Sequence, residues 1–210
     1  MKAEKPVESA QVPARERILH AAMQAFMDLG YAEASTLEIA TRARVSKREL
    51  YALFGNKQAM LTECIADRVQ RMQIAPSLPQ ARTREALTAV LAGLGAAVLR
   101  EVSAPPVMAV FRLAISESQR APEVAQTLEA ARQSVRNTVE KVVTEAQSAG
   151  LLGPGEPGDL SRQFLTLLWG DLMVGILLRV RESPDPAETE HRARSAAVAF
   201  LRLNPAAASG

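Results

Sequence analysis

The sequence predicts an all-α protein of about nine helices, in which a small N-terminal unit of three helices precedes a larger helical unit. Ala and Leu are abundant while aromatic residues make up only 4% of the chain, and such side chains lose little freedom in a helix. Apolar residues recur at intervals of three and four through most of the chain. Prolines and glycines separate these stretches, and no repeat of about 20 to 50 residues is found.

Composition limits the classes of function that fit this chain. The net charge is +2, so any affinity for nucleic acid must come from locally clustered charge. The single cysteine, Cys64, excludes an intramolecular disulfide and a Cys-rich zinc site, and indicates a reducing compartment. The most apolar stretch, Leu160 to Val180, is interrupted by Arg162, Asp171 and Arg179, which is too polar for a membrane span. We therefore expect a cytoplasmic protein without a membrane partner.

The first two helices are marked by their ends. Residues 1–13 contain two prolines and no apolar run, and are expected to form a disordered arm. Ala14 to Leu29 has helical periodicity and is followed by Gly30, a residue suited to a C-cap. Ser35 and Glu38 then form a Ser-x-x-Glu capping box, in which the glutamate is expected to reach back to the backbone. A short second helix should run to about Ala43.

A third short helix should open at Ser46, another capping residue, and run to about Phe54. A fourth is expected from Lys57 to about Ile74, before two nearby prolines. We place the domain boundary in this fourth helix, with a DNA-binding domain at 14–60, a second domain at 61–204 and a tail at 205–210.

Two short helices joined by a tight turn and preceded by a longer helix are the layout of a helix-turn-helix DNA reader. Cations at a helix N-terminus oppose the helix dipole by a few tenths of a kcal/mol each, and contact with phosphate or base edges would compensate. The segment from Thr41 to Lys57 contains one acidic residue, Glu49, and five cations: Arg42, Arg44, Lys47, Arg48 and Lys57.

The run Ile39-Ala-Thr-Arg-Ala-Arg-Val-Ser-Lys-Arg-Glu-Leu-Tyr-Ala-Leu-Phe54, followed by Lys57, resembles the TetR family of bacterial regulators, over roughly residues 15–65. The resemblance implies a repressor that binds operator DNA as a homodimer. In that family a glycine usually precedes the valine, whereas this chain has Arg44, which would cost of order 1 kcal/mol if the turn requires a positive φ. Arg44 could then add an operator contact.

The resemblance also assigns roles by position. It implies phosphate contact by Ser35 or Thr36 and by Tyr51 and Lys57. The readers of the recognition helix would be Ser46, Lys47 and Arg48. Glu49 could either accept a hydrogen bond from cytosine N4 or exclude other bases, and both alternatives stay open.

The rest of the chain is expected to hold five helices: Thr83 to Val102, Pro105 to Gln119, Pro122 to Ala149, Asp159 to Glu182, and Pro186 to Leu203. The helix from Asp159 is apolar almost all round, so it should be buried on two sides, one facing its own core and one a partner subunit. Residues expected at this dimer interface are Leu168, Leu172, Ile176, Ala193, Ala197, Phe200 and Leu201.

The resemblance further implies that the second domain binds a small-molecule effector. Adaptable methionines and a tryptophan suit an apolar or aromatic ligand, although the same residues could simply fill the core. Candidate pocket residues are Met72, Met108, Phe111, Arg112, Ile115, Phe164, Trp169 and Met173. The segments Val110-Phe-Arg-Leu to Glu117 and Ala121-Pro-Glu-Val also resemble a subgroup of regulators of efflux and quorum-linked genes.

Two other classes of function are an enzyme and a helical adaptor that binds protein. Gly153 to Gly158 matches G-x-G-x-x-G, but no strand is expected before it and its prolines remove amides that would hold a phosphate, so we expect a turn and no cofactor. His20, His191 and Cys64 form no catalytic or metal-binding motif, so neither catalytic nor metal residues are expected. A helical adaptor that binds protein is the remaining alternative, and weak salt dependence of binding would indicate it.

Overall fold

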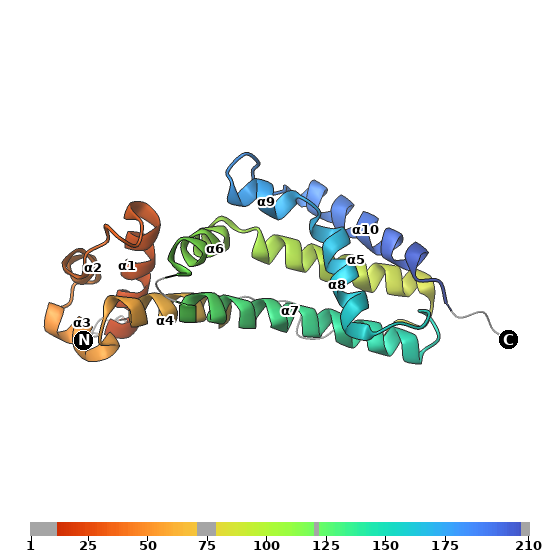
Figure 1. Cartoon of the computed structure of the whole chain (residues 1–210), viewed down its shortest axis with the longest axis horizontal. Helices are drawn as coiled ribbons and strands as arrows, with labels where there is room; N and C mark the ends of the chain where they lie inside the picture. Colours follow the sequence, from red (N-terminus) through yellow and green to blue (C-terminus); the bar gives the residue numbers. More distant parts are fainter. Residues whose placement is uncertain (1–11, 71–78, 120–121, 207–210) are drawn as a thin grey trace, which may run out of the picture. The chain divides into compact units, whose positions relative to one another are not determined.

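The computed structural model describes residues 12–70, 79–119 and 122–206, and all regular secondary structure in these ranges is α-helical (Figure 1). This confirms the all-α prediction. The described ranges contain ten helices: α1 (Ala14–Leu29), α2 (Thr36–Ala43), α3 (Lys47–Phe54), α4 (Lys57–Gln70), α5 (Arg84–Val102), α6 (Pro105–Glu117), α7 (Pro122–Ser148), α8 (Pro157–Trp169), α9 (Leu172–Leu177) and α10 (Pro186–Leu203).

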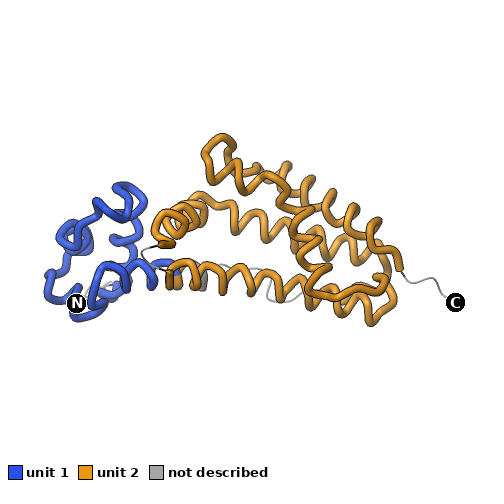
Figure 2. Tube along the Cα trace, in the orientation of Figure 1, with its two compact units in different colours: residues 1–65 blue, residues 66–210 orange. Residues whose placement is uncertain are grey.

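The chain divides into two compact units, Met1–Ile65 and Ala66–Gly210, and α4 crosses the division (Figure 2). In the N-terminal unit, Ile18 and Phe26 of α1, Ile39 of α2 and Leu50 of α3 are at most 2% exposed. Burial of such a side chain contributes about 1.5–3 kcal/mol. Helices as short as α2 and α3 are unstable alone, so this shared core is what holds them in place.

Both short helices begin at a serine that caps the backbone. The Oγ of Ser35 accepts a hydrogen bond from the amide of Glu38, and the Oγ of Ser46 accepts one from the amide of Glu49, each at 3.1 Å. The reciprocal half of the expected capping box is not formed. The carboxylate of Glu38 instead accepts from Nε of Arg42 at 2.7 Å, because Arg42 lies one turn further along the same face.

The C-terminal unit is organised around α5 and α10, which lie side by side (Figure 1). Gly95 of α5 permits a close approach, since a Cβ at that position would lie 3.0 Å from Cδ1 of Leu168 and 3.4 Å from Cβ of Ala193. The rings of Phe164 and Phe200 meet edge to face at 5.7 Å between centroids. These contacts join α5, α8 and α10 in one core.

The single helix expected from Asp159 to Glu182 is wrong, because the structure breaks it into α8 and α9. Gly170 follows α8 with φ 48° and ψ −123°, a conformation that is accessible to glycine and strained for other residues. Periodicity gave no sign of the break, since the apolar residues on its two sides continue the same pattern. This break accounts for the tenth helix.

Arg112 of α6 supports the short helix α9. Its Nε donates to the carbonyl of Leu177 at 3.0 Å and its Nη2 to the carbonyl of Ile176 at 2.7 Å. These carbonyls belong to the last turn of α9, where helical amides run out, and that of Ile176 also accepts from the amide of Arg179 at 3.1 Å. Burial, and to a lesser extent the charge of Arg179, lower the pKa of Arg112 from its usual value, but the guanidinium stays protonated.

The glycine-rich segment between α7 and α8 is a turn, as expected. Nε2 of Gln147 donates to the carbonyls of Gly153 and Gly155 at 3.0 and 2.9 Å. The segment follows the helix α7 rather than a strand, so it lacks the context of a nucleotide-binding loop.

Candidate nucleic-acid interface and apolar cavity

The turn between α2 and α3 contains a left-handed residue. Arg44 has φ 55° and ψ 48°, and its amide donates to the carbonyl of Thr41 at 3.2 Å. The positive φ considered from the sequence is therefore present, at a cost of about 1–2 kcal/mol for a residue with a Cβ. The Arg44 side chain is exposed, so the turn presents a cation to solvent.

The first turn of α3 presents a polar, cationic surface. Ser46, Lys47, Arg48 and Glu49 are exposed, while Leu50 is fully buried beneath them. The surface therefore sits on a helix that is fixed from below. Its display of side chains matches the pattern expected for a recognition helix.

Tyr51 links the two short helices. Its hydroxyl lies 3.1 Å from Oγ1 of Thr36 on α2, and its ring centroid lies 5.9 Å from Nζ of Lys47. The tyrosine remains 41% exposed, so these contacts leave part of its edge accessible. Thr36, Lys47 and Tyr51 thus form one continuous surface, on which Ser35 contributes the cap of α2.

Lys57, at the start of α4, contacts the segment between α1 and α2. Its Nζ donates to the carbonyl of Ala32 at 3.1 Å and lies 4.5 Å from the ring centroid of Tyr31. Both contacts are favourable for an ammonium group. Lys57 therefore has a structural role in the N-terminal unit, which its sequence position alone did not indicate.

Arg42 does not belong to the free cationic surface, contrary to the count made from the sequence. Its Nη1 donates to Asp28 at 2.7 Å and its Nε to Glu38 at 2.7 Å. The hydrogen bond to Asp28, followed by that to Glu38, raises the pKa of Arg42. Asp28 is fourteen positions away in the chain, so only the folded structure brings this neutralising partner close.

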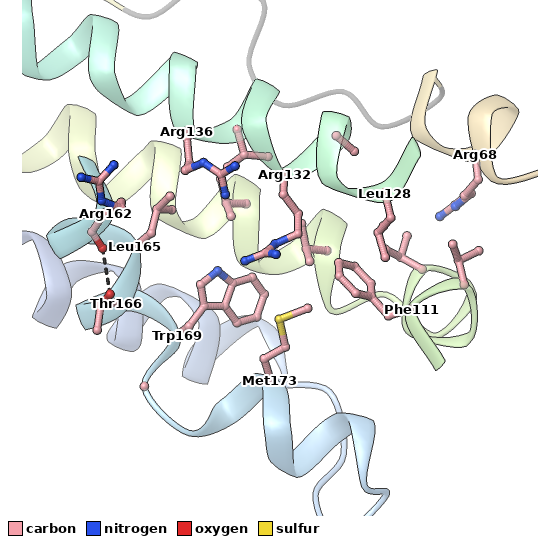
Figure 3. Close-up of a pocket in the computed structure, with 17 residues that line it drawn as sticks. Arg68, Phe111, Leu128, Arg132, Arg136, Arg162, Leu165, Thr166, Trp169 and Met173 are labelled. Atoms are coloured by element: carbon pink, nitrogen blue, oxygen red, sulfur yellow. Dashed lines mark hydrogen bonds between the residues drawn. The ribbon is translucent and has the colours of Figure 1, made fainter. Parts of the chain in front are cut away.

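The C-terminal unit contains a cavity of about 450 Å³, within the range of about 300–1,000 Å³ that is typical of small-molecule sites (Figure 3). Helices α5 to α9 supply most of its walls. It is lined by Arg68, Val98, Val102, Val107, Val110, Phe111, Leu128, Ala131, Arg132, Val135, Arg136, Arg162, Leu165, Thr166, Trp169, Gly170 and Met173.

Arginines gather at one part of this cavity. Arg132 and Arg136 lie one turn apart on α7, and Arg162 comes from α8. Figure 3 shows Arg132 beside Trp169 and Arg136 next to it, with Arg162 beyond Leu165, while Phe111 and Leu128 lie toward the other end of the cavity. The side chains of Arg132 and Arg162 are 56% and 64% exposed, whereas that of Arg136 is 20% exposed. Arg132, Arg136 and Arg162 therefore mark a solvent-facing part of the cavity, while a fourth arginine, Arg68, lies toward Phe111 and Leu128 (Figure 3).

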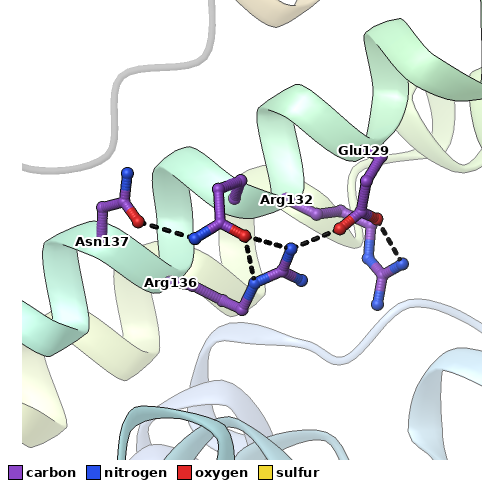
Figure 4. A network of polar contacts seen from close by, with 5 residues as sticks. Glu129, Arg132, Arg136 and Asn137 are labelled. Carbon is purple, nitrogen blue, oxygen red and sulfur yellow. Dashed lines mark hydrogen bonds and ion pairs between the residues drawn. The ribbon is translucent and has the colours of Figure 1, made fainter. Parts of the chain in front are cut away.

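Two carboxylates lie beside these arginines without lining the cavity. Glu129 accepts from Arg132 at 2.9 Å and also from Arg136, which in addition contacts Gln133 (Figure 4). The hydrogen bond from Arg136, with the charge of Arg132, lowers the pKa of Glu129. Arg162 pairs with Asp159. Arg132 and Arg136 thus share one carboxylate, and Arg162 pairs with another.

Comparison with known protein families decides the class of the protein. Residues 18–64 match the model of the bacterial regulatory proteins of the tetR family, and residues 89–203 match the C-terminal domain of AefR-like transcriptional repressors. The second match alone covers more than half of the chain. The chain belongs to the TetR family of bacterial regulators. None of the curated proteins compared with it matches in sequence.

Solved structures agree with this assignment. A TetR-family regulator from Mesorhizobium loti superposes with a TM-score of 0.76 at 19% identity, covering 94% of this chain and 99% of the other. A TetR-family regulator from Pseudomonas syringae gives 0.66 at 27% identity, covering 91% and 96%. The flavonoid-responsive regulator FrrA gives 0.74 at 25% identity, also covering 91% and 96%.

All residues that line the cavity except Arg68 lie within residues 89–203 of this TetR-family chain, the range that matches the AefR-like model. Only some of the expected pocket residues line it. Phe111, Trp169 and Met173 do. Met108 and Phe164 are buried in the core away from the lining, Ile115 is 59% exposed, and Arg112 binds the end of α9. Met72 falls outside the described residues. Arg132, Arg136 and Arg162 also line the cavity and were missed, because a charged residue on a helix gave no sign of facing a cavity.

The side chains expected at the dimer interface need a correction. The structure places Leu168, Leu172, Ile176, Ala193, Ala197, Phe200 and Leu201 in the chain's own core, each at most 6% exposed. Helix α8 packs against α7 and α10, α10 packs against α5, and α9 packs against α6, which explains these apolar residues. Contacts with a partner subunit would have to use other residues of these helices.

In the described residues no group of three or more His, Cys, Asp and Glu side chains could hold a metal ion. No single helix there is long and apolar enough to cross a membrane, although α5 and α6 reach that length and composition as a pair bent by 66°.

Proposed function

We propose that this TetR-family regulator is a repressor that binds a near-palindromic operator as a homodimer and is released by a small apolar or aromatic effector. The observation that carries the proposal is the exposed cationic start of α3, with Lys47 and Arg48 displayed above the buried Leu50. A recognition helix enters the major groove with its N-terminal residues toward the bases. Ser46, Lys47 and Arg48 would therefore contact base edges or phosphates.

Neighbouring groups would contact the DNA backbone. The exposed edge of Tyr51, the start of α2 at Ser35 and Thr36, and the guanidinium of Arg44 lie on or beside the same helix pair. Such phosphate contacts fix the register of a protein on the duplex. Lys57, at the start of α4, would add an ammonium group to these phosphate contacts.

Dimerisation is proposed on two grounds. One short recognition helix makes few contacts, and a two-fold dimer brings two of them to half-sites about 34 Å apart. The half-buried Leu167 on α8 and Val198 on α10 supply apolar surface beyond the buried core. We expect Val198→Arg to lower the dimer fraction in sedimentation equilibrium and to weaken DNA binding in parallel.

The effector proposal rests on the cavity and on one relative. A volume of about 450 Å³ lined by Phe111, Trp169 and Met173 suits a small apolar or aromatic molecule. The similar regulator FrrA is flavonoid-responsive. A ligand releases DNA only if it binds the two states of the protein with different affinity. The effector should therefore bind the free protein more tightly than the DNA complex.

Gel-shift titration with the DNA flanking the protein's own gene tests the proposal. Lys47→Ala should weaken binding and reduce its salt dependence by about one counterion, with an unchanged circular dichroism spectrum. Lys141→Ala, at an exposed lysine of α7, is the matched control and should leave DNA binding unchanged. Binding that is insensitive to salt, or an unaltered affinity of Lys47→Ala, would contradict the proposed reading surface and favour a protein-binding adaptor.

A further inference from the structure

We propose that the effector is an organic anion, a carboxylate with an apolar body, whose head group is bound by Arg132, Arg136 and Arg162 at the solvent-facing part of the cavity. This inference rests on the proposed function, since it names the chemical class of the molecule that releases DNA. It goes further because an apolar cavity alone would favour neutral ligands.

The first argument is the charge of the lining. Four arginines line the cavity, and within the described ranges no Asp or Glu does. Guanidinium groups bind carboxylates through two parallel hydrogen bonds, a geometry that a neutral head group cannot fully use. A cationic ligand would instead meet like charges on both α7 and α8.

The second argument is where the charge lies. Arg132 and Arg162 are more than half exposed, so a carboxylate bound there keeps part of its hydration and avoids the cost of full burial. The aliphatic side chains Val98 and Val102 of α5 and the ring of Phe111 lie in the same cavity. An amphipathic anion can therefore place its body among them while its head group stays at the arginines.

The third argument is that the cluster already binds carboxylates. Glu129 accepts from both Arg132 and Arg136, and Asp159 pairs with Arg162 (Figure 4). These contacts show that the guanidinium groups are placed to bind carboxylate oxygens. A ligand carboxylate would compete with Glu129 for Arg136. Removing the charge of Glu129 should therefore strengthen ligand binding.

The test uses two matched pairs of probes, octanoate with 1-octanol and 4-phenylbutyrate with 4-phenyl-1-butanol. The first pair has an aliphatic body and the second an aromatic one, so their comparison identifies the preferred body. Binding to the full-length protein is measured by calorimetry and by the fluorescence of Trp169, which is the only tryptophan of the chain and lines the cavity. Neither measurement requires DNA.

We expect at least one anion to bind about tenfold or more tightly than its alcohol, and the double variant Arg132→Gln/Arg136→Gln to abolish that preference. Glu129→Gln should raise anion affinity about twofold to threefold, a gain that misfolding cannot produce. Arg100→Gln, an exposed arginine of α5 outside the lining, is the matched control and should leave affinity unchanged. Equal binding of anion and alcohol, no binding of either anion at millimolar concentration, or a preference that survives in the double variant would overturn the inference.

A parallel gel shift separates this inference from the proposed function. Binding of the wild-type protein to DNA without any anion preference would refute the anionic effector alone. Anion binding by a protein that fails to bind DNA would support the ligand class and refute the proposed repressor. Release of DNA by the preferred anion, and by its alcohol only at higher concentration, supports both.

Discussion

The hydroxyl of Tyr51 on α3 lies 3.1 Å from Oγ1 of Thr36 on α2, which joins the two helices of the helix-turn-helix at their exposed surface. The buried side chains Ile39 and Leu50 join the same helices from below. The recognition helix is therefore fixed on two sides. Variants that remove this hydrogen bond from either helix should therefore weaken DNA binding by the same interaction, and their effects should not add.

Tyr51→Phe and Thr36→Val each remove one partner of this hydrogen bond. Each should weaken operator binding by about twofold to tenfold, the value of one net hydrogen bond. The double variant should bind no more weakly than either single variant, because the same interaction is lost in all three. Quantitative gel shifts measure the cycle, and fully additive losses would show that the two hydroxyls act independently.

Arg44 tests the cost of the left-handed turn. Arg44→Gly should stabilise the segment from α2 to α3 by about 1 kcal/mol relative to Arg44→Ala, since glycine adopts a positive φ without steric cost. Hydrogen exchange of amides in residues 36–54 reports this difference. Both variants lose the guanidinium group, so a loss of DNA affinity that is common to both gives the contribution of this charge to DNA binding. Equal protection in the two variants would contradict the strain.

Lys57 and Lys47 should differ in what their loss affects. Lys57→Met removes the contacts with Ala32 and Tyr31 and should destabilise the N-terminal unit by about 1 kcal/mol as well as weaken DNA binding. Lys47→Met should weaken DNA binding at unchanged stability. Hydrogen exchange of the N-terminal unit and gel shifts, measured on both variants, separate the two effects. Unchanged protection of the amides from hydrogen exchange in Lys57→Met would contradict the structural role of this lysine and indicate that it contributes to DNA binding alone.

Gly153 is expected to tolerate no side chain. A Cβ there would lie 2.5 Å from the carbonyl oxygen of Pro205, a backbone atom, so Gly153→Ala should destabilise the C-terminal unit by about 1–3 kcal/mol. In Gly93→Ala the new methyl group meets no atom within 4 Å, and alanine in α5 should add about 0.5–1 kcal/mol. Urea unfolding followed by Trp169 fluorescence measures both. Opposite signs are the expected result, and a loss of stability in Gly93→Ala as well would contradict the expected gain from alanine in α5.

Local signals were sufficient to predict the helix-turn-helix, and they were insufficient for the cavity. The starts of α2 and α3 can be predicted from Ser35 and Ser46, because a capping side chain and the amide that it binds are only three residues apart in the sequence. The role of Arg42 depends on Asp28, fourteen residues away, and the role of Arg136 depends on how α7 faces α8. The range Asp159 to Glu182 is apolar almost all round, which indicated a partner subunit, but packing inside one chain satisfies the same pattern.

The hydrogen bonds from Arg112 to the end of α9 allow a residue that does not line the cavity to affect the size of the cavity. Helix α9 is only six residues long, and its last carbonyls are bound by a side chain that does not line the cavity. Met173 lies on that short helix and does line it. A substitution at position 112 would therefore move Met173 without changing the identity of any lining residue, so ligand preference can diverge among relatives whose lining residues are identical.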